Sequence, residues 1–399
     1  MKDVKISDYL WFQEGPGVRN TQYTTSGVKL INVANLVDGN VDLSTSDRYI
    51  SEEEAYGKYN HFLADDGDFV IASSGIKIDY FDKKMGFIKK EHLPLCMNTS
   101  CIRFKVLDTN NLEIKYFMYY LKSNSFKKQL FNQITGSAQL NFGPSHLKKM
   151  TFPLIELKEQ KRIIERLDKT QNIINETKSL LSKYDTLIKS RFIEMFGDPV
   201  LNPKKWNIEK LKTLTSKIGS GATPKGGRES YISEGISLVR SMNVYKGYFE
   251  YEGLAHITED QARELDNVTL QENDVLINIT GASVARCCIL PKDVLPARVN
   301  QHVSILRATE KLNPVYLSNL LITDTEQRVL LGIGGAGGAT REAITKIELE
   351  TLDIPVPPLS LQNDFAAFVQ QIDKSKFAVQ KSLNKAETLY KSLMQEYFG

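Results

Sequence analysis

Two long stretches of the chain carry apolar residues at a seven-residue spacing. The segment from Glu159 to Met195 contains no glycine and no proline, and a second such series follows in the last forty residues. A sustained heptad spacing predicts long helices that pair as a coiled coil. The residues expected in the helix contact are Leu167, Ile174, Leu181, Ile188, Phe365, Ile372, Val379, Leu383 and Leu393.

The rest of the chain has a different pattern, in which short apolar runs alternate with Gly, Asn, Asp and Ser. The runs Asp68–Ala72, Asp274–Ile279 and Val303–Leu306 predict strands. The stretches Leu112–Ser123 and Asn313–Leu321 predict helices. The expected fold class is therefore α+β, with a mixed sheet and short helices in each globular part.

The chain is an internal duplication. Residues 152–163 match residues 354–365 without a gap, residues 68–75 match 274–281, and residues 27–35 match 235–243. Ordered matches along a half-chain indicate two copies of one unit. We expect globular domains at residues 1–152 and 198–354, each followed by a long spacer helix, at residues 153–197 and 355–399. The two helices are expected to pair with each other as an antiparallel coiled coil.

The order of globular domain, long helix, globular domain, long helix resembles the specificity subunit of type I restriction–modification systems. Several of the segments that carry the resemblance occur in both copies. The first copy departs from the pattern in lacking a counterpart of Pro203–Trp206 and in having Asn98-Thr99-Ser100 where the second has Val299-Asn300-Gln301-His302. The matching segments are Gly67–Val70 with Ser74-Gly75, Asn273–Leu276 with Thr280-Gly281, Gly338–Thr340, Pro153–Ile163, Pro355–Gln362, Phe196–Pro199 and Asn202–Trp206.

The resemblance implies a function. Each globular part would be a target recognition domain that reads one half of a bipartite, asymmetric sequence in double-stranded DNA. The helices would space the half-sites and dock partner subunits, namely two methyltransferase (modification) subunits and restriction/translocase subunits. The chain itself would be non-catalytic and hold no cofactor, while its partners would use S-adenosylmethionine, ATP and Mg²⁺.

The composition excludes some classes of protein but does not identify the function. The chain has 399 residues, 41% hydrophobic, and a net charge of +3 from 51 basic and 48 acidic residues. That balance neither requires nor excludes nucleic acid, because binding needs only a local basic surface. No apolar run long enough for a membrane span or a secretory signal occurs, and four cysteines cannot form a disulfide scaffold, so a cytoplasmic protein is expected.

The search for catalytic motifs favours a binding protein. Gly332–Gly337 formally matches G-x-G-x-x-G, but a polar, helix-like stretch precedes it, which favours a flexible loop over a dinucleotide site. Gly219–Lys225 lacks the spacing of a phosphate loop. No zinc spacing, adenine-methyltransferase motif or nuclease triad is found. The alternatives are a single-chain methyltransferase–nuclease with a recognition domain, or a non-DNA scaffold of two domains on a coiled coil.

Candidate DNA contacts are basic or amide side chains beside the matching segments. Arginine pairs with guanine and asparagine with adenine in the major groove, and lysine binds phosphates. The alternative for each is a surface salt bridge or a solvated face. In the first copy the candidates are Arg19, Asn20, Lys29, Lys77, Lys83 and Lys84, the first three taken as counterparts of residues in the second copy. In the second copy they are Thr223, Lys225, Arg228, Arg240, Asn243, Arg298 and Arg341.

Overall fold

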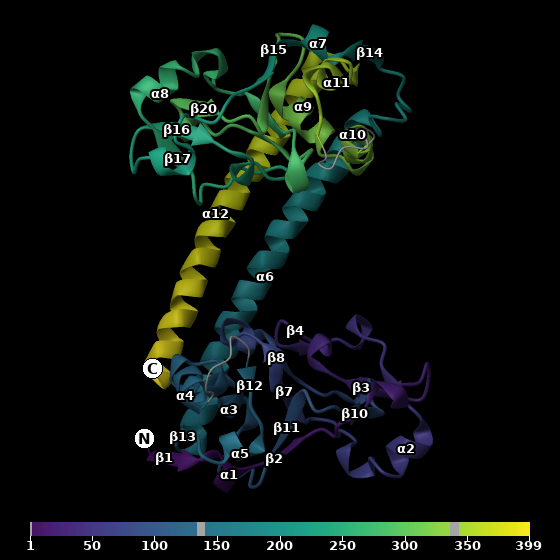
Figure 1. Cartoon of the computed structure of the whole chain (residues 1–399), viewed down its shortest axis with the longest axis vertical. Coiled ribbons are helices and arrows are strands. Elements are labelled where there is room, and N and C mark those ends of the chain that lie inside the picture. Colours follow the sequence, from purple (N-terminus) through teal and green to yellow (C-terminus); the bar gives the residue numbers. More distant parts are fainter. Residues whose placement is uncertain (1, 134–139, 336–342) are drawn as a thin grey trace. The chain divides into compact units, whose positions relative to one another are not determined.

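The computed structural model describes residues 2–133, 140–335 and 343–399. These residues form two compact units (Figure 1). Unit 1 comprises residues 1–176 and 382–399, and unit 2 comprises residues 177–381. Each unit therefore contains one globular domain, part of the first long helix and part of the second.

Unit 1 is an α+β domain around a four-stranded antiparallel sheet. Its strand order is β2-β11-β7-β9, and a second sheet, β10-β3-β6, joins β10 to β3 in parallel. The strands are β1 (Lys2–Lys5), β2 (Leu10–Glu14), β3 (Val28–Ile31), β4 (Leu36–Val37), β5 (Asn40–Val41), β6 (Tyr49–Ile50), β7 (Phe69–Ala72), β8 (Ser74–Ile76), β9 (Met85–Phe87), β10 (Leu95–Met97), β11 (Cys101–Val106), β12 (Leu140–Asn141) and β13 (Thr151–Leu154). The helices are α1 (Ile6–Tyr9), α2 (Glu52–Tyr56), α3 (Ile114–Leu121), α4 (Asn124–Gln133) and α5 (Pro144–Leu147).

Unit 2 repeats this topology. Its sheets have the orders β15-β21-β18-β19 and β17-β16-β20, and β16 pairs with β20 in parallel. The strands are β14 (Asn207–Lys210), β15 (Thr215–Ser220), β16 (Ile236–Val239), β17 (Ala255–Ile257), β18 (Val275–Asn278), β19 (Cys287–Ile289), β20 (Ala297–Val299), β21 (Val303–Ala308) and β22 (Asp353–Val356). The helices are α7 (Leu211–Leu214), α8 (Glu259–Arg263), α9 (Pro314–Leu321), α10 (Asp324–Gly335) and α11 (Lys346–Glu350). The predicted duplication and α+β class are confirmed.

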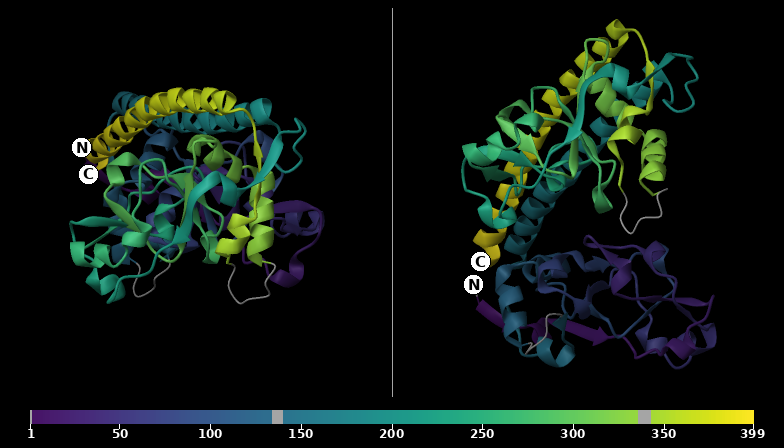
Figure 2. Two further views of the ribbon diagram at one scale, coloured as in Figure 1. Left: turned by 90° about the horizontal axis from the view of Figure 1, so that it is seen from above. Right: turned by 45° about the horizontal axis from the view of Figure 1, so that its top comes forward.

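The two long helices are α6 (Leu157–Phe196) and α12 (Leu359–Phe398). Absence of glycine and proline from their interiors lets each run for 40 residues, about 60 Å at ~1.5 Å per residue. Gly197 ends α6 with a positive φ of 78°, which glycine adopts without steric cost. Figure 2 shows the N-terminal β1 and the C-terminal end of α12 near each other in unit 1.

In each unit the beginning of one long helix packs against the end of the other. In unit 1, Arg166 of α6 donates a 2.8 Å hydrogen bond to the Tyr397 hydroxyl of α12. In unit 2, Lys376 of α12 forms a 2.6 Å ion pair with Asp185 of α6. An early residue of α6 thus meets the end of α12, and a later residue of α6 meets an earlier residue of α12, so the helices run antiparallel, as predicted.

The helix positions expected to face the partner are all at least half-buried. Those that are buried are Leu167, Ile174, Ile188, Phe365 and Leu383, and those that are half-buried are Leu181, Ile372, Val379 and Leu393. The strict heptad series missed Phe192, Phe196 and Phe398, each of which is at most 3% exposed. An α-helix has about 3.6 residues per turn, so seven residues fall slightly short of two full turns. The buried side of the helix therefore moves gradually away from a strict seven-residue series, and these phenylalanines lie on that side.

Aromatic side chains at the helix ends complete the two domain cores. The ring of Phe196 lies 4.7 Å from that of Tyr316 in unit 2. The ring of Phe398 lies 5.2 Å from that of Tyr116 in unit 1. Each tyrosine hydroxyl also donates to a backbone carbonyl just before a long helix, Tyr116 to Pro153 and Tyr316 to Pro355. The end of one helix and the start of the other are therefore fixed to the same core.

A buried glutamine attaches each long helix to its own domain. Gln160 and Gln362 are fully buried. Gln160 accepts a hydrogen bond from the Glu113 backbone N–H at 2.9 Å, and Gln362 accepts one from Asn313 at 2.8 Å. The amide groups of both glutamines also donate to backbone carbonyls in the two connecting turns. The match of these glutamines in the sequence thus reflects one anchoring interaction used twice.

We expect Phe398→Ala to destabilise unit 1 by roughly 3–5 kcal/mol, the usual cost of removing a buried aromatic ring, and to leave unit 2 unaffected. Phe196→Ala should do the reverse. Hydrogen exchange followed by mass spectrometry checks this, since protection should fall in α3 after the first change and in α9 after the second. Phe377→Ala is the control because Phe377 is 74% exposed. Equal loss in both units would contradict this account of the cores.

Candidate nucleic-acid interface

Three segments of the second domain meet at what we call the second corner: Ser220–Lys225 after β15, Thr280–Ser283 after β18, and Asn300–His302 before β21. Backbone contact holds two of them together. The Gly221 N–H donates to the Asn300 carbonyl at 3.1 Å. A Cβ on Gly221 would lie 1.8 Å from the Val299 carbonyl oxygen, so only glycine permits this approach.

A chain of hydrogen bonds crosses the second corner. The Thr223 hydroxyl donates to the side-chain oxygen of Gln301, Oε1. The Gln301 amide faces His302 Nε2 at 3.1 Å, and His302 Nδ1 lies 2.6 Å from the Thr280 hydroxyl. With the amide donating to Nε2, the neutral imidazole carries its proton on Nδ1 and donates to Thr280. Each member of the chain thus fixes the orientation of the next.

The second corner presents oriented donors beside a basic residue. The Thr280 hydroxyl retains its own proton, and the Gln301 amide retains a second N–H. Thr223, Gln301 and Lys225 are exposed. Amide and hydroxyl groups of this kind hydrogen-bond to base edges, and a lysine binds phosphate oxygens. The chemistry available here is recognition of a polar, anionic surface.

The first domain has a similar corner with different side chains, in which the Gly15 N–H donates to the Cys101 carbonyl at 3.1 Å. Gly15 occupies the place of Gly221: a Cβ there would lie 2.4 Å from the Asn98 backbone. Asn98 accepts a hydrogen bond from the next N–H, that of Thr99, while Asn300 accepts one from His302. Thr99 and Ser100 stand where the second domain has Gln301 and His302, and the loop after Gly15 carries the exposed predicted residues Arg19 and Asn20. The two corners therefore offer different groups on similar scaffolds.

Asn243, a predicted DNA contact, is held inside the second domain. Asn243 is fully buried. Its side-chain oxygen accepts a hydrogen bond from the Arg240 backbone N–H at 3.0 Å, and its side-chain NH2 group donates to the Glu250 backbone carbonyl at 2.9 Å. The counterpart in unit 1 is Asn35, which is also fully buried and caps its turn in the same way, rather than Asn20. The sequence match of residues 27–35 to residues 235–243 already aligned Asn35 with Asn243.

Two predicted arginines are held by neighbouring groups. The Arg298 side chain is 11% exposed, pairs with Asp266 at 2.7 Å and donates to the Ala262 carbonyl, which fits the salt-bridge alternative. Arg240 stacks over the Tyr231 ring at 5.3 Å and donates to the Gly253 carbonyl. Neither guanidinium is free to approach a base without giving up these contacts.

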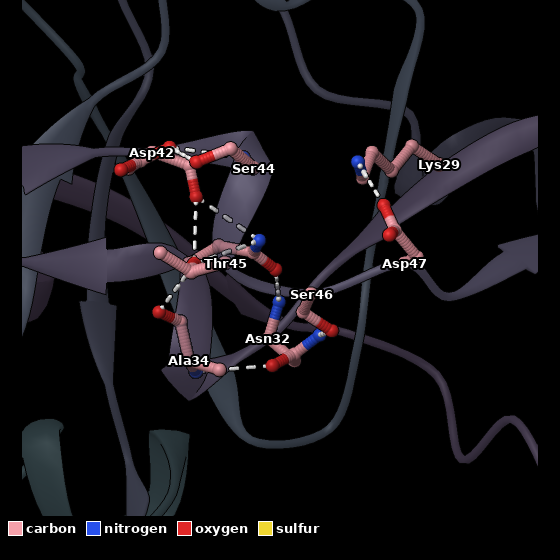
Figure 3. Close-up of polar contacts among 9 residues, drawn as sticks. Lys29, Asn32, Ala34, Asp42, Ser44, Thr45, Ser46 and Asp47 are labelled. Atoms are coloured by element: carbon pink, nitrogen blue, oxygen red, sulfur yellow. Dashed lines mark hydrogen bonds and ion pairs between the residues drawn. The ribbon is translucent and has the colours of Figure 1, made fainter. Parts of the chain in front are cut away.

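Lys29 is similarly engaged, and Figure 3 shows its surroundings. Its ammonium group pairs with Asp47 at 3.1 Å and lies 5.2 Å from the Tyr49 ring centre. Beside it, Asn32 donates to the Ser46 hydroxyl. The hydrogen bonds to Asp47 and Tyr49 raise the pKa of Lys29 despite the opposing effect of burial. Lys29 therefore stabilises the fold of this loop.

The remaining predicted residues are exposed, half-buried, or outside the part of the chain that the structure describes. Lys77 and Lys83 are exposed, and Lys83 lies 3.9 Å from Asp38, while half-buried Lys84 donates to the Val33 carbonyl. The Arg228 side chain and all of Arg341 lie outside the described residues. Gly332–Gly335 belong to the end of α10, so the part of the predicted glycine loop that the structure describes is helical.

Sequence reasoning missed two features of the second domain. Gln301 and His302 were recognised as part of a matching segment but not as candidates, although their position directly after a buried asparagine could have identified them. The other feature is a stack of an exposed and a half-buried tyrosine, in which the Tyr248 ring lies 5.0 Å from that of Tyr245 and the half-buried Arg286 lies 4.7 Å from the Tyr245 ring centre. Residues 244–249 show no periodic pattern that would have revealed it.

Metal-binding clusters and reactive thiols were sought among the described residues. No three His, Cys, Asp or Glu side chains among them lie close enough to hold a metal ion. The cysteines are buried, and burial raises the pKa of Cys96, Cys101 and Cys288 to about 12, so these thiols are not nucleophilic at neutral pH. No helix in the described ranges is long and apolar enough to cross a membrane.

Two similar domains with polar corners, joined by antiparallel helices, define a duplicated recognition protein. Comparison with known families gives the class: residues 19–183 and 203–387 each match the type I restriction modification DNA specificity domain. The chain therefore belongs to this family of DNA specificity subunits. The residues that carried the resemblance in the sequence lie in or beside both matched regions.

Individual relatives agree with this assignment. A putative type I restriction enzyme MjaX specificity subunit from Methanocaldococcus jannaschii is 24% identical over 92% of this chain and 85% of its own length. The type I restriction enzyme EcoBI specificity subunit of Escherichia coli is 21% identical, and the match spans 62% of this chain but only 57% of that relative. The crystal structure of the type I restriction-modification S subunit from M. genitalium has a similar fold, with a TM-score of 0.59 and 14% identity over all of this chain and 96% of the other.

The reassignment of Asn243 leads to a prediction about stability. Asn243→Ala should destabilise the second domain in the absence of DNA by about 1–3 kcal/mol, because it leaves buried backbone groups without partners. Asn35→Ala should have the same effect on the first domain. Thermal unfolding of the free protein measures both. If Asn243→Ala left unfolding unchanged and weakened only DNA binding, Asn243 would be a DNA contact after all.

Proposed function

We propose that this chain reads a bipartite, asymmetric target in double-stranded DNA, with one half-site for each domain. The observation that carries the proposal is the pair of corners, because they have similar backbone frames but present different side chains. Identical corners would favour two copies of one half-site. Corners with Thr99 and Ser100 in one domain and Gln301 and His302 in the other favour two different half-sites.

The exposed surface of the corners supports DNA as the ligand. Lys225 in the second corner and Arg19 in the loop of the first are exposed and have no ion-pair partner among the described residues. Cations of this kind contact phosphates and set the position of the protein on the duplex, while amide and hydroxyl groups contact the bases. A scaffold without a DNA role would show no salt-sensitive affinity for duplex DNA, whereas this chain should bind less tightly as salt rises.

We further propose that the long helices dock the partner subunits, namely two modification subunits and restriction/translocase subunits. Apolar side chains remain exposed on the helices of unit 2: Leu180, Leu187, Ile193 and Phe377. Exposed leucine and phenylalanine on an otherwise charged helix are typical of a protein contact. The chain would bind no cofactor, and S-adenosylmethionine, ATP and Mg²⁺ would be bound by the partners. The alternative of a single-chain methyltransferase–nuclease would require chemistry that the corners do not offer.

A substitution in one corner should change one half-site only. Gln301→Ala removes the amide that orients His302, and a lost base contact costs about 1–3 kcal/mol of discrimination. In a host carrying the partner subunits, the methylated motif should relax in one half and stay unchanged in the other. Thr99→Ala in the first corner is the matched variant and should affect the opposite half. Relaxation of both halves by Gln301→Ala would show that recognition is not modular.

The helices should also set the separation of the half-sites. Inserting four residues after Leu181 in α6 and four after Lys381 in α12 lengthens both helices by about 6 Å, a little over one helical turn, and so nearly preserves the buried face. The non-specific spacer should lengthen by about one or two base pairs at ~3.4 Å each, as mapped by methylation. A four-residue insertion after Thr109, in an exposed turn, is the control. An unchanged spacer after the helix insertions would eliminate the helices as the spacing element.

A further inference from the structure

At one buried position the two copies carry different residues, and the requirements of a stable core do not explain the difference. In unit 1, α4 buries Phe126, which is fully covered and packs near Phe81. In unit 2, the equivalent position of α10 is Glu326, only 4% exposed. The equivalence is fixed by the cap of each helix: Phe126 N–H donates to the Ser123 hydroxyl at 3.2 Å, and Glu326 N–H to the Thr323 hydroxyl at 3.3 Å.

Among the residues that the structure describes, none forms a hydrogen bond or ion pair with the Glu326 carboxylate. The covered hydroxyl of the neighbouring Thr325 has no hydrogen-bond partner there either. Burial, reinforced by the negative charges of Asp198 and Asp353, raises the pKa of Glu326 to about 7. Tyr316 is also near enough for Glu326 to raise the tyrosine's pKa. A buried, unpaired acid opposes folding, so the position is not optimised for stability.

Glu326 lines a pocket of about 540 Å³ in unit 2. The other carboxylates at the pocket already have partners, since Asp353 pairs with Lys210 at 2.6 Å and Glu348 caps α11 through Thr345. No positively charged side chain lines the pocket among the residues that the structure describes.

Apolar side chains surround the carboxylate. Val200, Ile208 and Val329 line the same pocket, and each is at least 36% exposed. A carboxylate without a partner, set among exposed aliphatic side chains, is chemically complementary to a lysine or arginine side chain. The methylene stem of such a side chain is apolar and its end is cationic. The negative charge disfavours the phosphate backbone of DNA, so this surface faces a protein.

We propose that the Glu326 pocket receives a lysine or arginine side chain of a modification subunit. This inference rests on the proposed assembly with modification subunits. The inserted cation would supply the charge-assisted hydrogen bond that Glu326 lacks. Because Phe126 occupies the equivalent position in the first copy, only the second copy can make this contact. The two modification subunits would then be held unequally, with one bound more tightly than the other.

The test uses two variants of the full chain, Glu326→Phe and Glu326→Gln. The first introduces the residue of the first copy, and the second keeps the size but removes the charge. Ionisation of a carboxyl with a raised pKa opposes folding, and this penalty is absent below about pH 4.5 and complete above about pH 7. Both variants should therefore melt at a higher temperature than wild type at pH 8, with the difference shrinking toward pH 4.5.

Binding of purified modification subunit, measured by titration calorimetry at pH 8, gives the decisive readout. Both variants should lose about tenfold or more in affinity at one of the two sites, the usual loss for a hydrogen bond to a charged group, despite their higher melting temperature. Glu272→Gln is the control, because it removes an exposed carboxylate that pairs with Lys292 in the same domain, and it should bind as wild type does.

The outcomes separate the two claims. If wild-type chain does not bind the modification subunit, the proposed function fails. If wild type binds and both Glu326 variants bind with the same affinity, the pocket inference is overturned and the proposed function stands. If only Glu326→Phe loses affinity, the pocket contributes shape rather than charge, which also overturns the inferred cation contact.

Discussion

Each domain core depends on the ends of both long helices. Phe398 closes the core of unit 1 against Tyr116, and Phe196 closes that of unit 2 against Tyr316. Buried glutamines attach the start of each helix to the same cores. A helix fixed to a core at each end cannot shift along its axis without opening a core. This constraint suits the spacing role that we propose for the helices, and neither α6 nor α12 contains a glycine or a proline.

Duplication keeps the supporting interactions and varies the exposed ones. In both domains the buried aspartate before the central strand pairs with an arginine of the adjacent strand, Asp68 with Arg103 at 3.1 Å and Asp274 with Arg307 at 2.8 Å, although the two arginines stand at different positions of β11 and β21. The capping asparagines, the glycine of each corner and the turn asparagines recur as well. The side chains beside them differ, at the corners and at Glu326. The positions that differ between the copies on a similar frame are those to which we assign separate tasks, reading DNA at the corners and holding a partner subunit at Glu326.

The sequence predicted the architecture well because duplication makes structural positions visible twice. The heptad series located both long helices, and the matched segments located equivalent strands, the anchoring glutamines and the corner turns. The candidate DNA contacts could not be derived from the sequence in the same way, because residue type does not reveal where a side chain points. Asn243 has the chemistry of an adenine reader but points inward, and Arg298 is held by Asp266. Lys29 and Asp47 are close only because β3 and the loop before β6 meet in the fold. The hydrogen-bond chain from Thr223 to Thr280 joins three segments distant in sequence, so no local pattern could disclose it.

The most direct test of the account is the adenine methylome of a host that carries this chain together with its partner subunits. The account predicts a methylated motif of two different specified halves separated by a fixed number of unspecified base pairs, present only when this chain is expressed. A continuous motif, a motif of two identical halves, or methylation that is unchanged when this chain is deleted would contradict it.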